Sequence, residues 1–271
     1  MSLRWIVSLA LCASPLFAAN QISWVASFGA DSGACGLRTA PCRTFAGAIP
    51  NTVAGGMVKA VDSADYSLNG AQLTIQTSVT IDGSGTGASF IGAGNAFVVQ
   101  AGAVTIRDLI INVPANSTAI NISGADVNIE NTTITGAPGY ALGISLVGGT
   151  LFADHLSIVG AGSAVQITGG KATFRNSVLR GNTVGILAIA LSGTATVMID
   201  RSQLSLNQVG VLADGVSRPN GGCTIRVSNS LITSNGSALR QDRGGQVLSY
   251  GNNVIDDNTD DGSSPVLATL K

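Results

Sequence analysis

The sequence of 271 residues contains little charge. Asp, Glu, Lys and Arg together make up 11% of it, and the formal net charge is −1. Binding to nucleic acid relies on a basic surface that neutralises phosphates, which this composition does not supply. We therefore expect no nucleic-acid partner.

Aromatic residues and histidine are also scarce. Phe, Trp and Tyr make up 4% of the chain, and His155 is the single histidine. Few aromatic rings leave few platforms on which sugar rings can stack. One histidine cannot supply the second Cys/His pair that a zinc site needs. The composition thus predicts no metal site of this kind.

No apolar run is long enough to cross a bilayer as a helix. The N-terminal stretch MSLRWIVSLALCASPLFAAN has one Arg, an apolar run from Trp5 to Cys12 and two alanines near its end. These are the features of a secretory signal peptide, and the run is too short for a membrane anchor. The segment LALC resembles a lipoprotein signal, but Leu11 stands where a small residue is expected. We predict a signal peptide over residues 1–19 and a secreted protein, periplasmic or extracellular.

Three cysteines remain after this segment. Cys35 and Cys42 lie close together in GACGLRTAPCRTF. In an exported protein such a pair predicts a small disulfide loop. Cys223 has no partner, and we expect it to be a buried, unreactive thiol.

A repeated sequence pattern dominates the rest of the chain. From Val104 onward a pattern apolar-x-apolar-x-Asn-Ser-x-apolar recurs at intervals of 21 to 28 residues, and a less regular copy surrounds Thr77. Each unit has a second short apolar stretch that ends in Gly. A period of this length with two-residue alternation is typical of a solenoid whose units bury their apolar faces by stacking. Two strands per unit, rich in Val, Ile and Thr with Gly at the bends, predict a parallel β-helix.

The fold expected is therefore all-β, a single domain of about eight coils over residues 20–271. We assign residues 20–56 to an N-terminal cap, 57–255 to the coils and 256–271 to a C-terminal cap. The segment TFAGAIPNTVA has apolar residues at roughly helical spacing, which predicts a short capping helix.

The chain resembles the right-handed parallel β-helix, pectin-lyase-like superfamily. The resemblance rests on the stacked units, on the segment APCRTFAGAI, which is similar to a PC-K/R-T-F/I-x-x-A-I motif of secreted bacterial members, and on SYGNNVIDDN near the end. Those members have no settled activity. The segment GGMVKAVDSADY departs from the family pattern and keeps only Tyr66 in place. The resemblance implies a right-handed coil.

Because coils stack in register, equivalent repeat positions form columns along the sheet. The fifth position predicts a structural ladder at a bend, in which amides hydrogen-bond one another and the backbone. Its members are Asp108, Asn131, His155, Asn176, Arg201, Asn229 and Asn252. A second Asn set follows at Asn182, Asn207, Asn235 and Asn258.

One position earlier lies a concentration of charge that faces away from the core by alternation. It comprises Arg107, Glu130, Asp154, Arg175 and Asp200, with Gln76 at its start. Two interpretations remain open. The column is a surface ion ladder that contributes about 0.2 to 1 kcal/mol per pair. Alternatively, as the superfamily's lyases and hydrolases imply, it is a catalytic or Ca²⁺ site on an outward sheet face.

The sequence therefore supports two functions. The first is non-catalytic binding of a polysaccharide, a cell-surface glycan or another surface partner by a monomer without a cofactor. The second is a polysaccharide lyase or glycoside hydrolase at the charged column. Ca²⁺ is also considered at the acidic segment from Asp256 to Gly262, where the spacing does not match an EF-hand. The units vary little in length, so no long loops wall a cleft, which favours binding.

Overall fold

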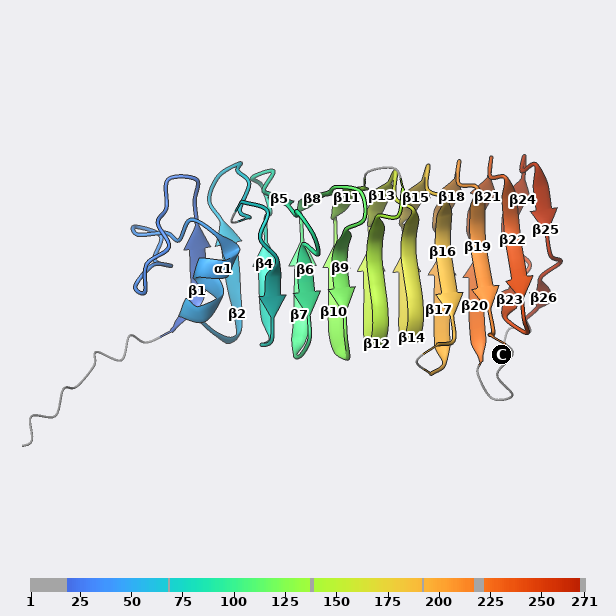
Figure 1. Cartoon of the computed structure of the whole chain (residues 1–271), viewed down its shortest axis with the longest axis horizontal. Helices are drawn as coiled ribbons and strands as arrows, with labels where there is room; N and C mark the ends of the chain where they lie inside the picture. The colour runs from blue at the N-terminus through green and yellow to red at the C-terminus, as the bar shows by residue number, and fades with distance from the viewer. Residues whose placement is uncertain (1–18, 68, 137–138, 192, 217–221, 269–271) are drawn as a thin grey trace, which may run out of the picture.

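In the computed structural model the chain is a parallel β-helix, as predicted. The structure describes residues 19–67, 69–136, 139–191, 193–216 and 222–268. Successive coils pair through parallel strands, and Figure 1 shows them stacked along the long axis of the molecule. The predicted signal peptide lies almost entirely outside the described residues. In the described ranges, no helix has the length and apolar character to cross a membrane.

The smaller of two sheets, called sheet 2, has eight strands in the described chain, in agreement with about eight coils. Its strands are short and contribute one strand per coil. They are β5 (Ser89–Ile91), β8 (Ile110–Val113), β11 (Thr133–Gly136), β13 (Ser157–Val159), β15 (Val178–Arg180), β18 (Gln203–Ser205), β21 (Leu231–Thr233) and β24 (Val254–Asp256).

The larger sheet bends and has two limbs, which we call sheet 1 and sheet 3. Sheet 1 contains β1 (Asn20–Val25), β2 (Thr52–Ala60), β4 (Val79–Asp82), β7 (Ala103–Arg107), β10 (Ala125–Glu130), β17 (Ala195–Asp200), β20 (Cys223–Ser228), β23 (Gln246–Ser249) and β26 (Val266–Leu267). Sheet 3 contains β3 (Leu73–Ile75), β6 (Phe97–Val99), β9 (Thr118–Ile122), β16 (Val184–Ile189), β19 (Val209–Asp214), β22 (Ser237–Asp242) and β25 (Asp260–Gly262). The long strands β12 (Leu142–Asp154) and β14 (Ser163–Arg175) run through both limbs.

Glycine makes the bend between sheet 3 and sheet 1. In β12, Gly148 and Gly149 have φ values of 128° and 84°, a region that side chains rarely allow. A Cβ atom at Gly149 would also lie 2.1 Å from the carbonyl oxygen of Ala125 in the previous coil. The bend of this coil therefore requires glycine.

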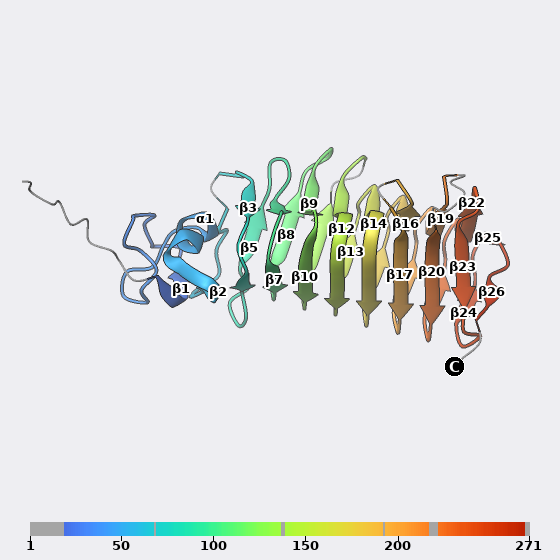
Figure 2. The same ribbon diagram turned by 90° about the horizontal axis from the view of Figure 1, so that it is seen from below.

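The expected caps contribute strands to the sheets as well. In the N-terminal segment, β1 pairs with β2 through Ile22 opposite Met57 and Trp24 opposite Lys59. In the C-terminal segment, β25 pairs with β22 and β26 with β23. Figure 2 shows these two ends on either side of the stacked coils.

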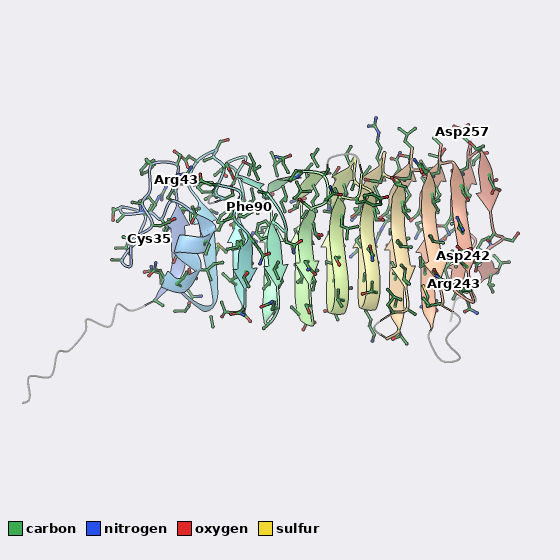
Figure 3. All side chains as sticks on the ribbon, in the orientation of Figure 1. Cys35, Arg43, Phe90, Asp242, Arg243 and Asp257 are labelled. Carbon is green, nitrogen blue, oxygen red and sulfur yellow. A yellow bond between two sulfur atoms is a disulfide. The ribbon has the colours of Figure 1, made fainter. Side chains whose placement is uncertain are left out.

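The predicted capping helix is present as one turn, α1 (Phe45–Ala48), followed by a 3₁₀ turn, η1 (Ile49–Asn51). Thr44 caps α1 by accepting a hydrogen bond of 3.0 Å from the amide of Gly47. The buried ring of Phe45 packs 5.2 Å from Tyr66 and 6.5 Å from Phe90. Figure 3 labels Phe90 in the first coils, beside the segment that carries Cys35 and Arg43. Aromatic packing thus closes the N-terminal end of the core.

Candidate functional site

The charged residues predicted from the repeat lie on consecutive strands of sheet 1. Arg107 is opposite Glu130, Glu130 opposite Asp154, Asp154 opposite Arg175, and Arg175 opposite Asp200. The alternate residues Ile106, Ile129, Phe174 and Ile199 are buried. The five side chains therefore form one column on the outer face of sheet 1, which we call the charged column.

The column begins with two residues that the repeat did not identify, Lys59 and Asp82. Asp82 lies opposite Arg107, and Lys59 lies opposite Asp82. The placement of Gln76 and Thr77 in the repeat is wrong, because the strand that precedes them, β3, pairs with β6 of sheet 3. The triplet Val-Thr-Ile occurs in both β4 and β7, and this match could have revealed the correct alignment.

Asp82 is the centre of an ion cluster. Its fully buried carboxylate lies 3.0 Å from Nη2 of Arg107 and 3.3 Å from Nζ of Lys59, and it accepts a hydrogen bond of 2.8 Å from the amide of Ser84. Burial raises the pKa of Asp82, but the hydrogen bonds from Arg107 and Ser84 outweigh burial and hold the pKa well below its ordinary value. This stretch of the column is therefore a structural ion cluster.

The later carboxylates are held by residues of the neighbouring corner. Oδ1 of Asp154 accepts a hydrogen bond of 2.7 Å from Asn176 and lies 3.2 Å from Nδ1 of His155. Asp200 lies 2.9 Å from Arg201 and accepts a hydrogen bond of 3.0 Å from Asn229. Both oxygens of Asp200 and one oxygen of Asp154, Oδ1, are thus engaged by side chains of the protein.

Glu130 is held differently. It accepts a hydrogen bond of 2.6 Å from the amide of Asn128, and it makes no ion pair within the described residues. Its neighbour across the sheet, Asp154, is also an acid. The column is thus least compensated between these two carboxylates.

Beside this pair lies an exposed aromatic ring. Phe152 of β12 points away from the core, between the buried residues Leu151 and Ala153, and is 38% exposed. The strand register surrounds it with eight outward residues, and we call the nine together the Phe152 patch. They are Asp126, Asn128 and Glu130 of β10, Thr150, Phe152 and Asp154 of β12, and Lys171, Thr173 and Arg175 of β14.

The patch is polar around its central ring. With strands about 4.8 Å apart and alternate residues about 6.6 Å apart, it spans about 10 Å by about 13 Å. Asp126 accepts a hydrogen bond of 2.5 Å from Thr150, while Lys171 makes no ion pair within the described chain. The patch can therefore offer an apolar ring together with carboxylate, amide, hydroxyl and ammonium groups.

The predicted ladder at the fifth position is a corner of left-handed backbone between sheets 1 and 2. Six residues there have φ values between 44° and 56°, namely Asp108, Asn131, His155, Asn176, Arg201 and Asn229. In the last coil Gly251 takes this conformation, because β23 and β24 are separated by one extra residue: Val227 pairs with Ser249, whereas Leu231 pairs with Val254. Asn252 nevertheless belongs to the ladder as predicted, since its Oδ1 accepts a hydrogen bond of 3.1 Å from the backbone amide of Asn229 and its Nδ2 donates to Oδ1 of Asn229 at 3.0 Å.

The second Asn set forms a hydrogen-bonded ladder at the corner between sheets 2 and 3. The Nδ2 atom of Asn182 donates to Oδ1 of Asn207 at 2.9 Å, Asn207 to Asn235 at 3.0 Å, and Asn235 to Asn258 at 3.0 Å. Each of these Oδ1 atoms also accepts a hydrogen bond from the backbone amide of the Asn one coil earlier in the ladder. These side-chain amides satisfy the hydrogen bonds of backbone groups that are buried at the corner, which is a structural role.

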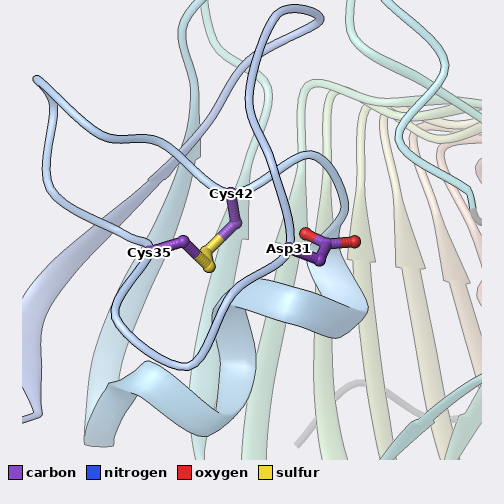
Figure 4. Close-up of side chains that lie close together, drawn as sticks. All are labelled: Asp31, Cys35 and Cys42. Carbon is purple, nitrogen blue, oxygen red and sulfur yellow. A yellow bond between two sulfur atoms is a disulfide. The ribbon is translucent and has the colours of Figure 1, made fainter.

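The predicted disulfide between Cys35 and Cys42 is confirmed, and Cys223 is a buried free cysteine. Figure 4 shows Asp31 beside the disulfide. Both Asp31 oxygens serve the start of α1, since they accept hydrogen bonds from the amides of Arg43 and Thr44 and from the Thr44 hydroxyl. With the sulfurs bonded to each other and the carboxylate engaged, this cluster does not suit a metal.

The acidic C-terminal segment is exposed and bonds to its own turns. The Asp260 carboxylate accepts a hydrogen bond of 2.9 Å from the backbone amide of Gly262, and the Asp261 carboxylate accepts one of 3.1 Å from Nδ2 of Asn258. Ca²⁺ binding at this segment stays a prediction.

Comparisons with known proteins give limited similarity. No protein-family model and no curated protein matches the chain. Among solved structures, a rhamnogalacturonan lyase is similar over 84% of this chain and 75% of that chain, with a TM-score of 0.48 and 12% identity. The parallel β-helix is established by the strand pairings themselves, and this similarity says nothing of activity.

Proposed function

We propose that the protein is secreted and binds polysaccharide through the Phe152 patch as a monomer, without a cofactor and without cleaving the chain. The observation on which this depends is the exposed Phe152 ring at the centre of a patch of polar side chains. An aromatic ring offers contact to the C–H face of a pyranose, and the surrounding polar groups offer hydrogen bonds to its hydroxyls.

The state of the column supports binding over catalysis. Acid and base catalysis needs carboxyl groups that are free to reach the bond that breaks. Asp82 is buried between two cations, both oxygens of Asp200 are engaged by Arg201 and Asn229, and Oδ1 of Asp154 is engaged by Asn176. In addition, the corners around the patch are short, so no loop wall encloses a substrate.

The disulfide supports a location outside the cytoplasm. Such bonds persist in oxidising compartments and are rare where thiols are kept reduced. Cys35 and Cys42 close a loop against β1, where the amide of Cys42 donates to the carbonyl of Trp24 at 2.9 Å. The bond thus fixes the N-terminal end of the solenoid.

The test is a binding panel of neutral and uronate-containing polysaccharides, with affinity measured by calorimetry. We expect at least one polysaccharide of the panel whose binding Phe152→Ala weakens about tenfold, which is about 1.4 kcal/mol. Phe28→Ala is the matched control, because Phe28 is a 72% exposed ring outside the patch, and its affinity should equal that of the parent.

The same mixtures are followed for unsaturated products at 235 nm and for new reducing ends. We expect neither. Product formation that Glu130→Gln or Asp154→Asn abolishes would contradict the proposal and favour the lyase or hydrolase at the charged column. If the parent and Phe152→Ala bound every polysaccharide of the panel with equal affinity, the Phe152 patch would not be the binding site.

A further inference from the structure

A second feature suited to a ligand lies on the outer face of sheet 3, beyond the glycine bend from the Phe152 patch. It is an open hollow of about 550 Å³, lined by Tyr140, Leu142, Ser163, Gln166, Thr183 and two glycines. This volume lies in the range of small-ligand sites. Leu142 and Ser163 are neighbours on β12 and β14, so the hollow extends across adjacent coils.

One wall of the hollow is a solvent-exposed aromatic ring. Tyr140 is 87% exposed, although a ring of this size is usually at least half covered in a folded protein. It precedes β12 directly, next to Ala141 and Leu142. A fully presented ring beside a hollow is available to stack on a flat, partly apolar ligand.

The polar groups of the hollow are uncharged and have free hydrogen-bonding capacity. Within the described residues, the amide of Gln166 and the hydroxyls of Ser163 and Thr183 make no side-chain hydrogen bond. None of the lining residues is Asp, Glu, Lys, Arg or His. In contrast, five of the nine residues in the Phe152 patch carry charge.

This chemistry fits a ligand with an apolar face, many hydroxyls and no charge. A charged sugar would lose hydration on entering the hollow and find no counter-ion there. We propose that the Tyr140 hollow is a second, separate binding site and that it takes neutral pyranose units, with the Tyr140 ring against the sugar face and Gln166, Ser163 and Thr183 bonding its hydroxyls. This proposal does not depend on the function of the Phe152 patch.

The experiment uses the full chain with two neutral probes, cellohexaose and mannohexaose, and one charged probe, a hexamer of galacturonate. We expect a neutral hexamer to bind, and Tyr140→Ala to weaken that binding tenfold or more. Tyr140→Phe should retain most of it, because the ring makes the main contact. Gln166→Ala should give a smaller loss of a few fold.

Three further readouts separate the two sites. Phe152→Ala should leave the affinity of the neutral hexamer unchanged, and Tyr140→Ala should leave any galacturonate binding unchanged. The affinity of the neutral hexamer should not change between low and high NaCl, since no charge lines the hollow. Both Tyr140 variants should keep the parent's melting temperature, because Tyr140 is 87% exposed and buries little surface.

Failure of both neutral hexamers to bind would overturn the proposal. So would an unchanged affinity in Tyr140→Ala, or a loss caused by Phe152→Ala alone, which would place the neutral sugar on the patch instead. Failure of the Phe152 patch to bind any polysaccharide, with Tyr140-dependent binding intact, would refute the proposed function and leave this site standing.

Discussion

Two stretches of the charged column have similar residues and different surroundings. In the first, Asp82 is fully buried between Lys59 and Arg107. In the second, Glu130 and Asp154 remain partly exposed beside the Phe152 ring. In the first stretch the charges alternate in sign and form an ion cluster, whereas in the second two acids are adjacent and form an accessible polar face.

The corner that follows each strand explains the difference. After β10, two residues lead directly into sheet 2, whereas after β4 the chain makes a longer loop before β5. Ser84 at the start of that loop donates its amide to Asp82 at 2.8 Å, and its hydroxyl lies 3.3 Å from Lys59. The longer loop after β4 therefore covers Asp82 and donates a hydrogen bond to it. The two-residue corner after β10 is too short to cover Glu130 in this way.

The largest expected effect is on Asp82. Asp82→Asn should lower the free energy of unfolding by about 3 kcal/mol, because it leaves two cations beside a buried neutral amide. Glu130→Gln, the equivalent change in the second stretch, should cost about 1 kcal/mol or less. Urea denaturation of the three proteins measures both values. Equal costs would mean that the two stretches do not differ in the way described.

The pH dependence of stability should show the same contrast. The pKa of Asp82 is lowered in the folded state, so its contribution is complete above the pKa of an unfolded Asp, about 3.9, and declines as the pH falls below it. The stability difference between the parent and Asp82→Asn should therefore narrow by roughly 2 kcal/mol from pH 6 to pH 2.5. A difference that stays constant over this range would contradict the ion cluster.

A smaller effect is expected in the second stretch. The double variant Glu130→Gln with Asp154→Asn should change stability by about 1 kcal/mol or less, and it removes repulsion between adjacent acids, so it can even stabilise the fold. Added Ca²⁺ should not raise the melting temperature of the parent. A rise that disappears in Asp154→Asn would make a Ca²⁺ site the better account.

The sequence was sufficient for the architecture because each coil repeats the same local pattern. Alternation about Ile129 and Phe174 correctly identified which side chains enter the core, and the short Cys35 to Cys42 spacing correctly identified the disulfide. The alignment was wrong around Thr77, where an irregular loop shifts the strands. After Tyr250 one extra residue puts Gly251 in the left-handed position, while Asn252 still bonds to Asn229 as the ladder predicts.

The binding features were harder to predict for a different reason. Phe152 lies in the run Leu-Phe-Ala, where three apolar residues in succession hide the two-residue alternation that makes the ring point outward. Tyr140 lies outside any strand, so no periodicity predicts its exposure. Strand register and solvent exposure, which depend on neighbouring coils, were needed to find both rings.

The central claim is that polysaccharide contacts the second stretch of sheet 1 and not the first. Met57 and Phe152 lie in the same outward column, separated by Thr80, Thr105 and Asn128, which is about 19 Å along the solenoid. Hydroxyl-radical footprinting, with a polysaccharide of the panel whose affinity falls in Phe152→Ala, measures the oxidation of both side chains in one sample. We predict that bound polysaccharide lowers the oxidation of Phe152 severalfold and leaves that of Met57 unchanged. Protection of Met57 with Phe152 still reactive would contradict the account.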